Sequence, residues 1–72
     1  MTATQFINQY VTGPFVLYRK IDGELLPGDF HDGPGSIPED ADYLTVIEVE
    51  SKHLPNKNHT DFLGIICRRI NE

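Results

Sequence analysis

Tyr-Leu-Thr-Val-Ile-Glu-Val-Glu, residues 43–50, is the densest run of β-forming residues in the chain, and it decides the fold. Branched and aromatic side chains suit a pleated sheet, and successive side chains of a strand point to opposite faces. The first half of this run is apolar on both faces, whereas Glu48 and Glu50 make the second half polar on one face. Because strands that are apolar on both sides are typical of a sheet interior, we predict a strand with neighbours rather than an edge strand.

A second apolar run, residues 62–70, is the natural partner of the first. The polar connection at residues 51–61 is too long for a tight turn, so it leaves the register open. With Glu50 opposite Asp61, one face would carry Leu44, Val46 and Glu48 with Leu63, Ile65 and Cys67, and the other Thr45, Ile47 and Val49 with Phe62, Gly64 and Ile66. Both faces of this hairpin would then be largely apolar, and each face would need a cover.

Residues 3–12 predict a short helix, which Thr2 or Thr4 can cap and which Gly13 and Pro14 end. Its apolar stripe comprises Phe6, Ile7, Tyr10 and Val11. A helix of this length has little stability alone, so we expect the stripe to dock on the sheet. The alternative is an arm that folds only on a partner.

Residues 15–21 predict a strand, with Leu17 and Arg19 on the same face. The dipeptide that follows at residues 22–23, Asp-Gly, is a strong signal for a type I′ hairpin turn. Residues 24–26 would return as a short edge strand that Pro27 stops.

Residues 27–42 predict a long irregular loop, since three prolines and three glycines interrupt it. Its large apolar residues are Phe30 and Ile37, and we expect at least one of them to anchor the loop to the core. A brief helical turn can form at residues 36–39.

These elements predict a single domain over residues 1–72. The expected fold is α+β, with the N-terminal helix packed on a small antiparallel sheet of about four strands in a two-layer sandwich.

Composition narrows the class of protein. A lone cysteine, Cys67, excludes an internal disulfide and fits a reducing compartment. The chain shows no signal-peptide pattern and no apolar run long enough to span a bilayer, so we expect a cytoplasmic protein. It also carries no cofactor-binding motif, and no cofactor is expected.

Charge is unevenly distributed along the chain, whose net charge is −5. The segment at residues 22–50 contains no Lys or Arg, and its acids are Asp22, Glu24, Asp29, Asp32, Glu39, Asp40, Asp42, Glu48 and Glu50. Such a segment repels phosphate, which argues against nucleic-acid binding, and it suits a basic partner surface. The alternatives are that the acids only keep a small protein soluble or that they imitate nucleic-acid phosphate.

Catalytic and metal-binding chemistry has weak support in the sequence. His31, His53 and His59 could supply metal ligands, but their spacing matches no known site and exposed loop histidines are the simpler interpretation. Cys67 shares a predicted face with Leu63 and Ile65, which favours a core thiol over a nucleophile.

The leading hypothesis is therefore a small acidic protein-binding module without enzymatic activity: an inhibitor, adaptor or regulatory accessory protein, of the kind phages and bacteria use. It would bind a partner with a basic surface, or a second copy of itself, through an acidic loop and an apolar sheet face. The candidate binding residues are Asp29, Phe30, Asp32, Glu39, Asp40 and Asp42. The alternative is a small nuclease- or hydrolase-like enzyme, whose residues would be His53 with Glu48 or Glu50 and Arg68 or Arg69.

Overall fold

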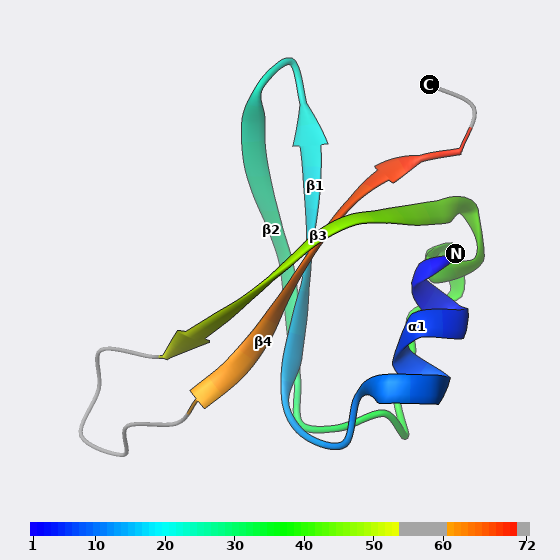
Figure 1. The fold of residues 1–72 in the computed structure, drawn as a ribbon, viewed down its shortest axis with the longest axis vertical. Helices are drawn as coiled ribbons and strands as arrows, with labels where there is room; N and C mark the ends of the chain where they lie inside the picture. Colours follow the sequence, from blue (N-terminus) through cyan, green and yellow to red (C-terminus); the bar gives the residue numbers. More distant parts are fainter. Residues whose placement is uncertain (54–60, 71–72) are drawn as a thin grey trace.

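The computed structural model describes residues 1–53 and 61–70 and confirms an α+β fold, in which an N-terminal helix lies against a four-stranded sheet (Figure 1). In chain order its elements are α1 (Ala3–Tyr10), β1 (Phe15–Ile21), β2 (Glu24–His31), the 3-10 helix η1 (Glu39–Tyr43), β3 (Leu44–His53) and β4 (Asp61–Arg69).

The sheet is mixed, whereas the sequence predicted antiparallel strands throughout. Its strand order is β2-β1-β4-β3, with β1 and β4 parallel and the other two pairs antiparallel. The segment after β2 carries the chain past α1 to the far edge of the sheet, so that β4 returns through the middle alongside β1 (Figure 1).

The predicted strand at residues 43–50 forms as β3, but at an edge of the sheet rather than in its interior. The N-terminus covers the first part of this edge. The amide of Val46 donates to the carbonyl oxygen of Met1 over 3.0 Å, and Thr2 forms an isolated bridge with Thr45. A strand with two apolar faces can therefore lie at an edge when another segment satisfies its outer backbone groups.

A bulge between Val46 and Glu48 divides the pairing of β3 with β4. Before it, Leu44, Thr45 and Val46 pair with Arg69, Arg68 and Cys67; after it, Glu48, Val49 and Glu50 pair with Ile66, Ile65 and Gly64. The first half confirms the predicted faces, because its register differs from the trial register by two residues. In the second half the extra residue exchanges Glu48 and Val49 between the faces, so that part of the prediction was wrong.

The hairpin of β1 and β2 turns at Asp22 and Gly23, whose φ angles of 51° and 84° fit the predicted type I′ turn. β2 then continues through Pro27 to His31, although the sequence predicted that the strand would stop at this proline. Proline is tolerated here because β2 is an edge strand, with a bulge in its pairing next to the proline.

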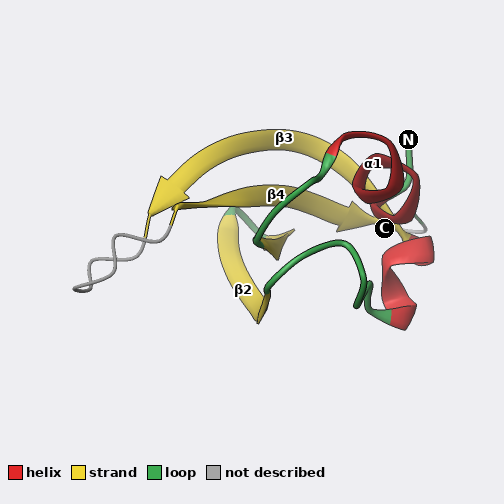
Figure 2. Cartoon of the chain, turned by 90° about the horizontal axis from the view of Figure 1, so that it is seen from below, coloured by secondary structure: helices red, strands yellow, loops and turns green. Residues whose placement is uncertain are grey.

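The core lies between the sheet and a layer formed by α1 and η1, which lie together at one end of the arched sheet (Figure 2). Its largest fully buried side chains are Ile7, Phe15, Ile65 and Cys67. The predicted cap of α1 at Thr2 is confirmed, since the Gln5 amide donates to the Thr2 hydroxyl oxygen over 3.1 Å. Ile37 anchors the long segment by packing against this core, as predicted.

No helix of the described part of the chain lies over the opposite face of the sheet, yet Val16 and Ile66 on that face are only 6% and 2% exposed. Aromatic side chains of the sheet lie around Val16 on this face. Phe30 lies opposite Val16 in the ladder, and its ring meets Phe62 edge-on at a centroid distance of 5.8 Å. The sequence predicted that a loop or a partner would cover the second apolar face of the sheet. Phe30, which belongs to the predicted loop segment, lies on this face as part of β2.

Candidate functional site

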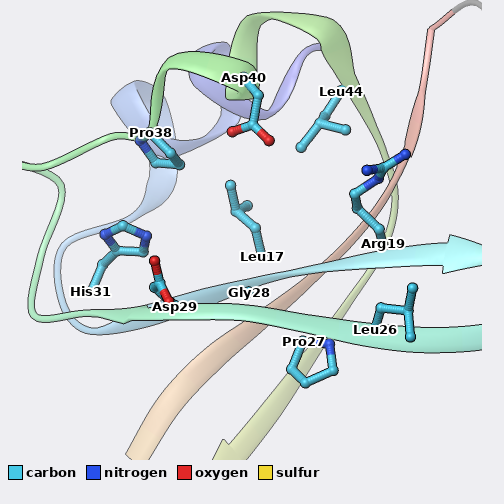
Figure 3. Close-up of a pocket in the computed structure, with 10 residues that line it drawn as sticks. All are labelled: Leu17, Arg19, Leu26, Pro27, Gly28, Asp29, His31, Pro38, Asp40 and Leu44. Atoms are coloured by element: carbon cyan, nitrogen blue, oxygen red, sulfur yellow. The ribbon is translucent and has the colours of Figure 1, made fainter.

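An open pocket of about 340 Å³ lies on the helix side of the sheet, between β2 and η1 (Figure 3). Its apolar lining comprises Leu17, Leu26, Pro27, Gly28, Pro38 and Leu44, and its polar lining comprises Arg19, Asp29, His31 and Asp40. The pocket is therefore apolar at its floor and carries two carboxylates, a guanidinium and an imidazole around that floor.

The bulge in β2 gathers the residues of the first wall. Leu26 pairs with Arg19 and His31 pairs with Phe15, so both lie on the core side although an odd number of positions separates them. An extra residue in the strand makes this possible, because it switches the alternation of side chains between the faces. Gly28 lies at this bulge, where a Cβ atom would approach the carbonyl oxygen of Leu17 to 2.8 Å.

His31 forms one end of the pocket. Its imidazole stacks on the ring of Phe15, with centroids 4.8 Å apart and an angle of 14° between the planes. Phe15 is fully buried, so this contact fixes His31 at the border of the core. The sequence predicted an exposed loop histidine, and this was wrong because β2 extends to His31, which is half-buried.

η1 supplies the second wall of the pocket. It follows Pro38, whose carbonyl oxygen accepts a 3.1 Å hydrogen bond from the amide of Ala41, and Ala41 is completely buried. The neighbouring Asp40 directs its carboxylate toward Leu17 at the centre of the pocket (Figure 3).

The negative charge of Asp40 affects the pKa of Cys67, a core residue behind the pocket. Burial, and secondarily the negative charge of Asp40, raise the pKa of the Cys67 thiol from 9.0 to about 11. Cys67 is completely buried and its Sγ donates weakly to the carbonyl oxygen of Ile65 over 3.7 Å, which confirms the predicted core position of this thiol.

The structure brings two of the predicted binding residues, Asp29 and Asp40, into this pocket from different elements. Asp32, Glu39 and Asp42 are exposed in the same part of the chain, the last two on η1 itself. Phe30 lies on the other face of the sheet, so it does not share a surface with these acids.

Sequence reasoning missed that Arg19, His31 and Leu26 line the same pocket as Asp29 and Asp40. The alternation of side chains along residues 15–21 had already predicted that Arg19 and Leu17 lie on the same face of the sheet. The extension of β2 through its proline, which brings in His31, had no comparable signal in the sequence.

The residues of the alternative catalytic set are spread over the sheet. Glu50 forms an ion pair with Lys52 at 3.2 Å on the face opposite α1. Arg68 and Arg69 lie opposite Thr45 and Leu44, and therefore on different faces. The side chain of His53, and His59 as a whole, lie outside the described residues.

Among residues 1–52 and 61–70, no three His, Cys, Asp or Glu side chains lie close enough together to hold a metal ion. No helix in the described part of the chain is both long enough and apolar enough to cross a membrane. Neither a scan against family models nor searches of curated proteins and of solved structures found a match. Function must therefore be inferred from the chemistry of the chain's own residues.

Proposed function

We propose that this chain is a cytoplasmic protein-binding module without enzymatic activity, an inhibitor, adaptor or regulatory subunit that recognises a partner with a basic surface. The observation that carries this proposal is the placement of Asp29 and Asp40 around one open, apolar-floored pocket. A concave apolar surface edged by charge combines the two usual components of a protein interface, a desolvated anchor and electrostatic complementarity.

Neighbouring acids extend this surface beyond the pocket. Asp32, Glu39 and Asp42 are exposed, and the segment at residues 22–50 that contains them has no Lys or Arg. Their combined field would speed the approach of a basic partner, an effect that falls as salt concentration rises. We name the surface formed by Asp29, Asp32, Glu39, Asp40 and Asp42 the acidic surface.

The face opposite α1 is less suited to the role that the sequence suggested for it. Val16 and Ile66 at its centre are already buried without a partner. This supports an anchor within the pocket rather than on that face.

A charge-reversal experiment tests the module. The variant Glu39→Lys, Asp40→Lys, Asp42→Lys should lose a partner that the wild type captures from native lysate, with its circular dichroism spectrum unchanged. The matched control, Asp22→Lys, Glu24→Lys, Glu48→Lys, makes the same change of charge at exposed positions away from the pocket and should retain the partner. Equal capture by both triple variants at low salt would remove the acidic surface from the mechanism.

A further inference from the structure

The pocket between β2 and η1 combines an apolar centre with charged residues from both walls. Leu17 lies at its centre, Leu26 and Leu44 border it, and the carboxylates of Asp29 and Asp40 belong to different walls (Figure 3). A group that fills it must present an apolar stem to the leucines and hydrogen-bond donors to the carboxylates. Among protein side chains, lysine and arginine combine a hydrocarbon stem with a cationic head.

The charges around the pocket favour a cation over an anion. Two carboxylates face a single guanidinium, that of Arg19, which lies at the end near Leu44 while Asp29 lies at the opposite end (Figure 3). The other members of the acidic surface add negative charge, and among the residues that the structure describes no further Lys or Arg lines the pocket. An incoming carboxylate or phosphate would therefore meet a net negative site.

The first wall also permits a peptide backbone to approach. The carbonyl oxygen of Leu17 fills the space that a Cβ atom of Gly28 would need, and the strand that contains Gly28 is an exposed edge of the sheet. Because this edge is exposed, a partner segment that crosses β2 can place one side chain above Leu17.

We propose that this pocket receives one arginine or lysine side chain from a basic segment of the protein partner. Its stem packs on Leu17, and its head donates to Asp29 and Asp40. Other basic residues of the same segment meet the rest of the acidic surface. This inference rests on the proposed function, since it names the group by which the module would hold its partner.

A peptide titration tests the pocket without knowledge of the partner. The probe is the capped pentapeptide Gly-Gly-Arg-Gly-Gly, with a lysine version beside it, added to ¹⁵N-labelled protein. We expect saturable amide shifts at Leu17, Gly28, Asp29 and Asp40. Two matched probes lack the charge and should give no saturable shifts: citrulline keeps the length of the arginine side chain, and norleucine keeps the four-carbon stem of lysine.

Variants of the protein complete the test. Asp29→Asn with Asp40→Asn keeps the size of both side chains and should abolish the saturable shifts, because the charge-assisted hydrogen bonds are lost. Asp22→Asn with Glu24→Gln changes the net charge equally at exposed positions outside the pocket and should leave them in place. Shifts that survive the first pair of substitutions, or that citrulline reproduces, would overturn the proposal.

The two proposals can fail separately. If the peptide binds in the pocket but the partner still binds the charge-reversed variant, the proposed protein-binding function is wrong. The specificity of the pocket for arginine or lysine would then still hold. A partner lost on charge reversal, with no arginine or lysine peptide in the pocket, would support the module and overturn the inferred occupant.

Discussion

Lys52 and Tyr18 contact each other across β4, with the Lys52 ammonium 5.2 Å from the centre of the Tyr18 ring. Both side chains pass over Gly64, where a Cβ atom would lie 2.9 Å from Cε of Lys52 and 3.2 Å from Cε1 of Tyr18. The missing side chain at Gly64 therefore leaves the space through which Lys52 reaches the ring. This contact helps to cover the face of the sheet opposite α1.

Replacing Gly64 by valine should destabilise the protein by no more than about 1 kcal/mol, because valine is the better strand former but its methyl groups displace the end of Lys52 and crowd the Tyr18 ring. Urea unfolding measures the change. Lys52→Ala provides the control background, in which the valine should cost less because the stem of Lys52 is gone. An equal cost in both backgrounds would mean that Gly64 is not needed for the Lys52–Tyr18 contact.

The edge-on pair of Phe30 and Phe62 should contribute a coupling free energy of about 0.5–1.5 kcal/mol beyond the area that it buries. A double-mutant cycle with alanine at both positions, followed by urea unfolding, measures this coupling. Leu25→Ala is the matched control, since Leu25 lies on the same strand and is 42% exposed, as Phe30 is. Phe30→Ala should cost more than Leu25→Ala, because it also uncovers Val16. A coupling free energy near zero would show that the two rings lie close together without stabilising each other.

Short-range patterns in the sequence predicted the local structure well. The cap at Thr2, the strand at residues 15–21 and the Asp22-Gly23 turn each depend on residues within a few positions of one another. The pairing of Leu44 and Val46 with the face of Cys67 was also predictable, since apolar alternation fixes the faces for any even shift of register.

The parallel neighbour of β1 was not predictable by these means. No local signal states which strand will lie beside another, and the chain order suggested two hairpins in an antiparallel sheet. The bulges in β2 and β3 were equally hidden, since a single inserted residue changes which face every later side chain occupies. The acids of the candidate site were found from charge density, but their convergence depends on the bulge in β2 and on the placement of η1.

Gly28→Ala should destabilise the protein by about 1–3 kcal/mol, because the new Cβ atom would lie 2.8 Å from the carbonyl oxygen of Leu17. Backbone at the centre of a strand pair cannot move aside as a flexible side chain can. Gly35→Ala is the control, since nothing lies within 4 Å of its Cβ position, and it should change stability by no more than about 0.5 kcal/mol. Urea unfolding of both variants measures the difference, and equal stabilities would argue against a close approach at the bulge.

Alkaline pH should weaken the fold through Cys67, whose pKa is raised from 9.0 to about 11 by burial and by Asp40. The unfolded chain releases the thiol proton near pH 9, whereas the folded chain retains it until about pH 11. The free energy of unfolding should therefore be independent of this thiol below pH 9 and should fall as the pH rises from 9 to 11. Unfolding curves of the wild type and of Cys67→Ala measure this effect. The free energy by which the wild type is more stable than the variant should decrease between pH 9 and pH 11.

The contribution of Asp40 to this pKa can be separated from that of burial. Asp40→Asn removes the negative charge that faces the core, so it should lower the pKa of Cys67, which a titration of the Cys67 ¹³Cβ chemical shift in the folded protein measures. Glu39→Gln removes the same charge from the neighbouring position on η1, which does not line the pocket, and should leave the pKa of Cys67 unchanged. Equal pKa values of Cys67 in the two variants would contradict the inward direction of the Asp40 carboxylate, on which the pocket's affinity for a cation also depends.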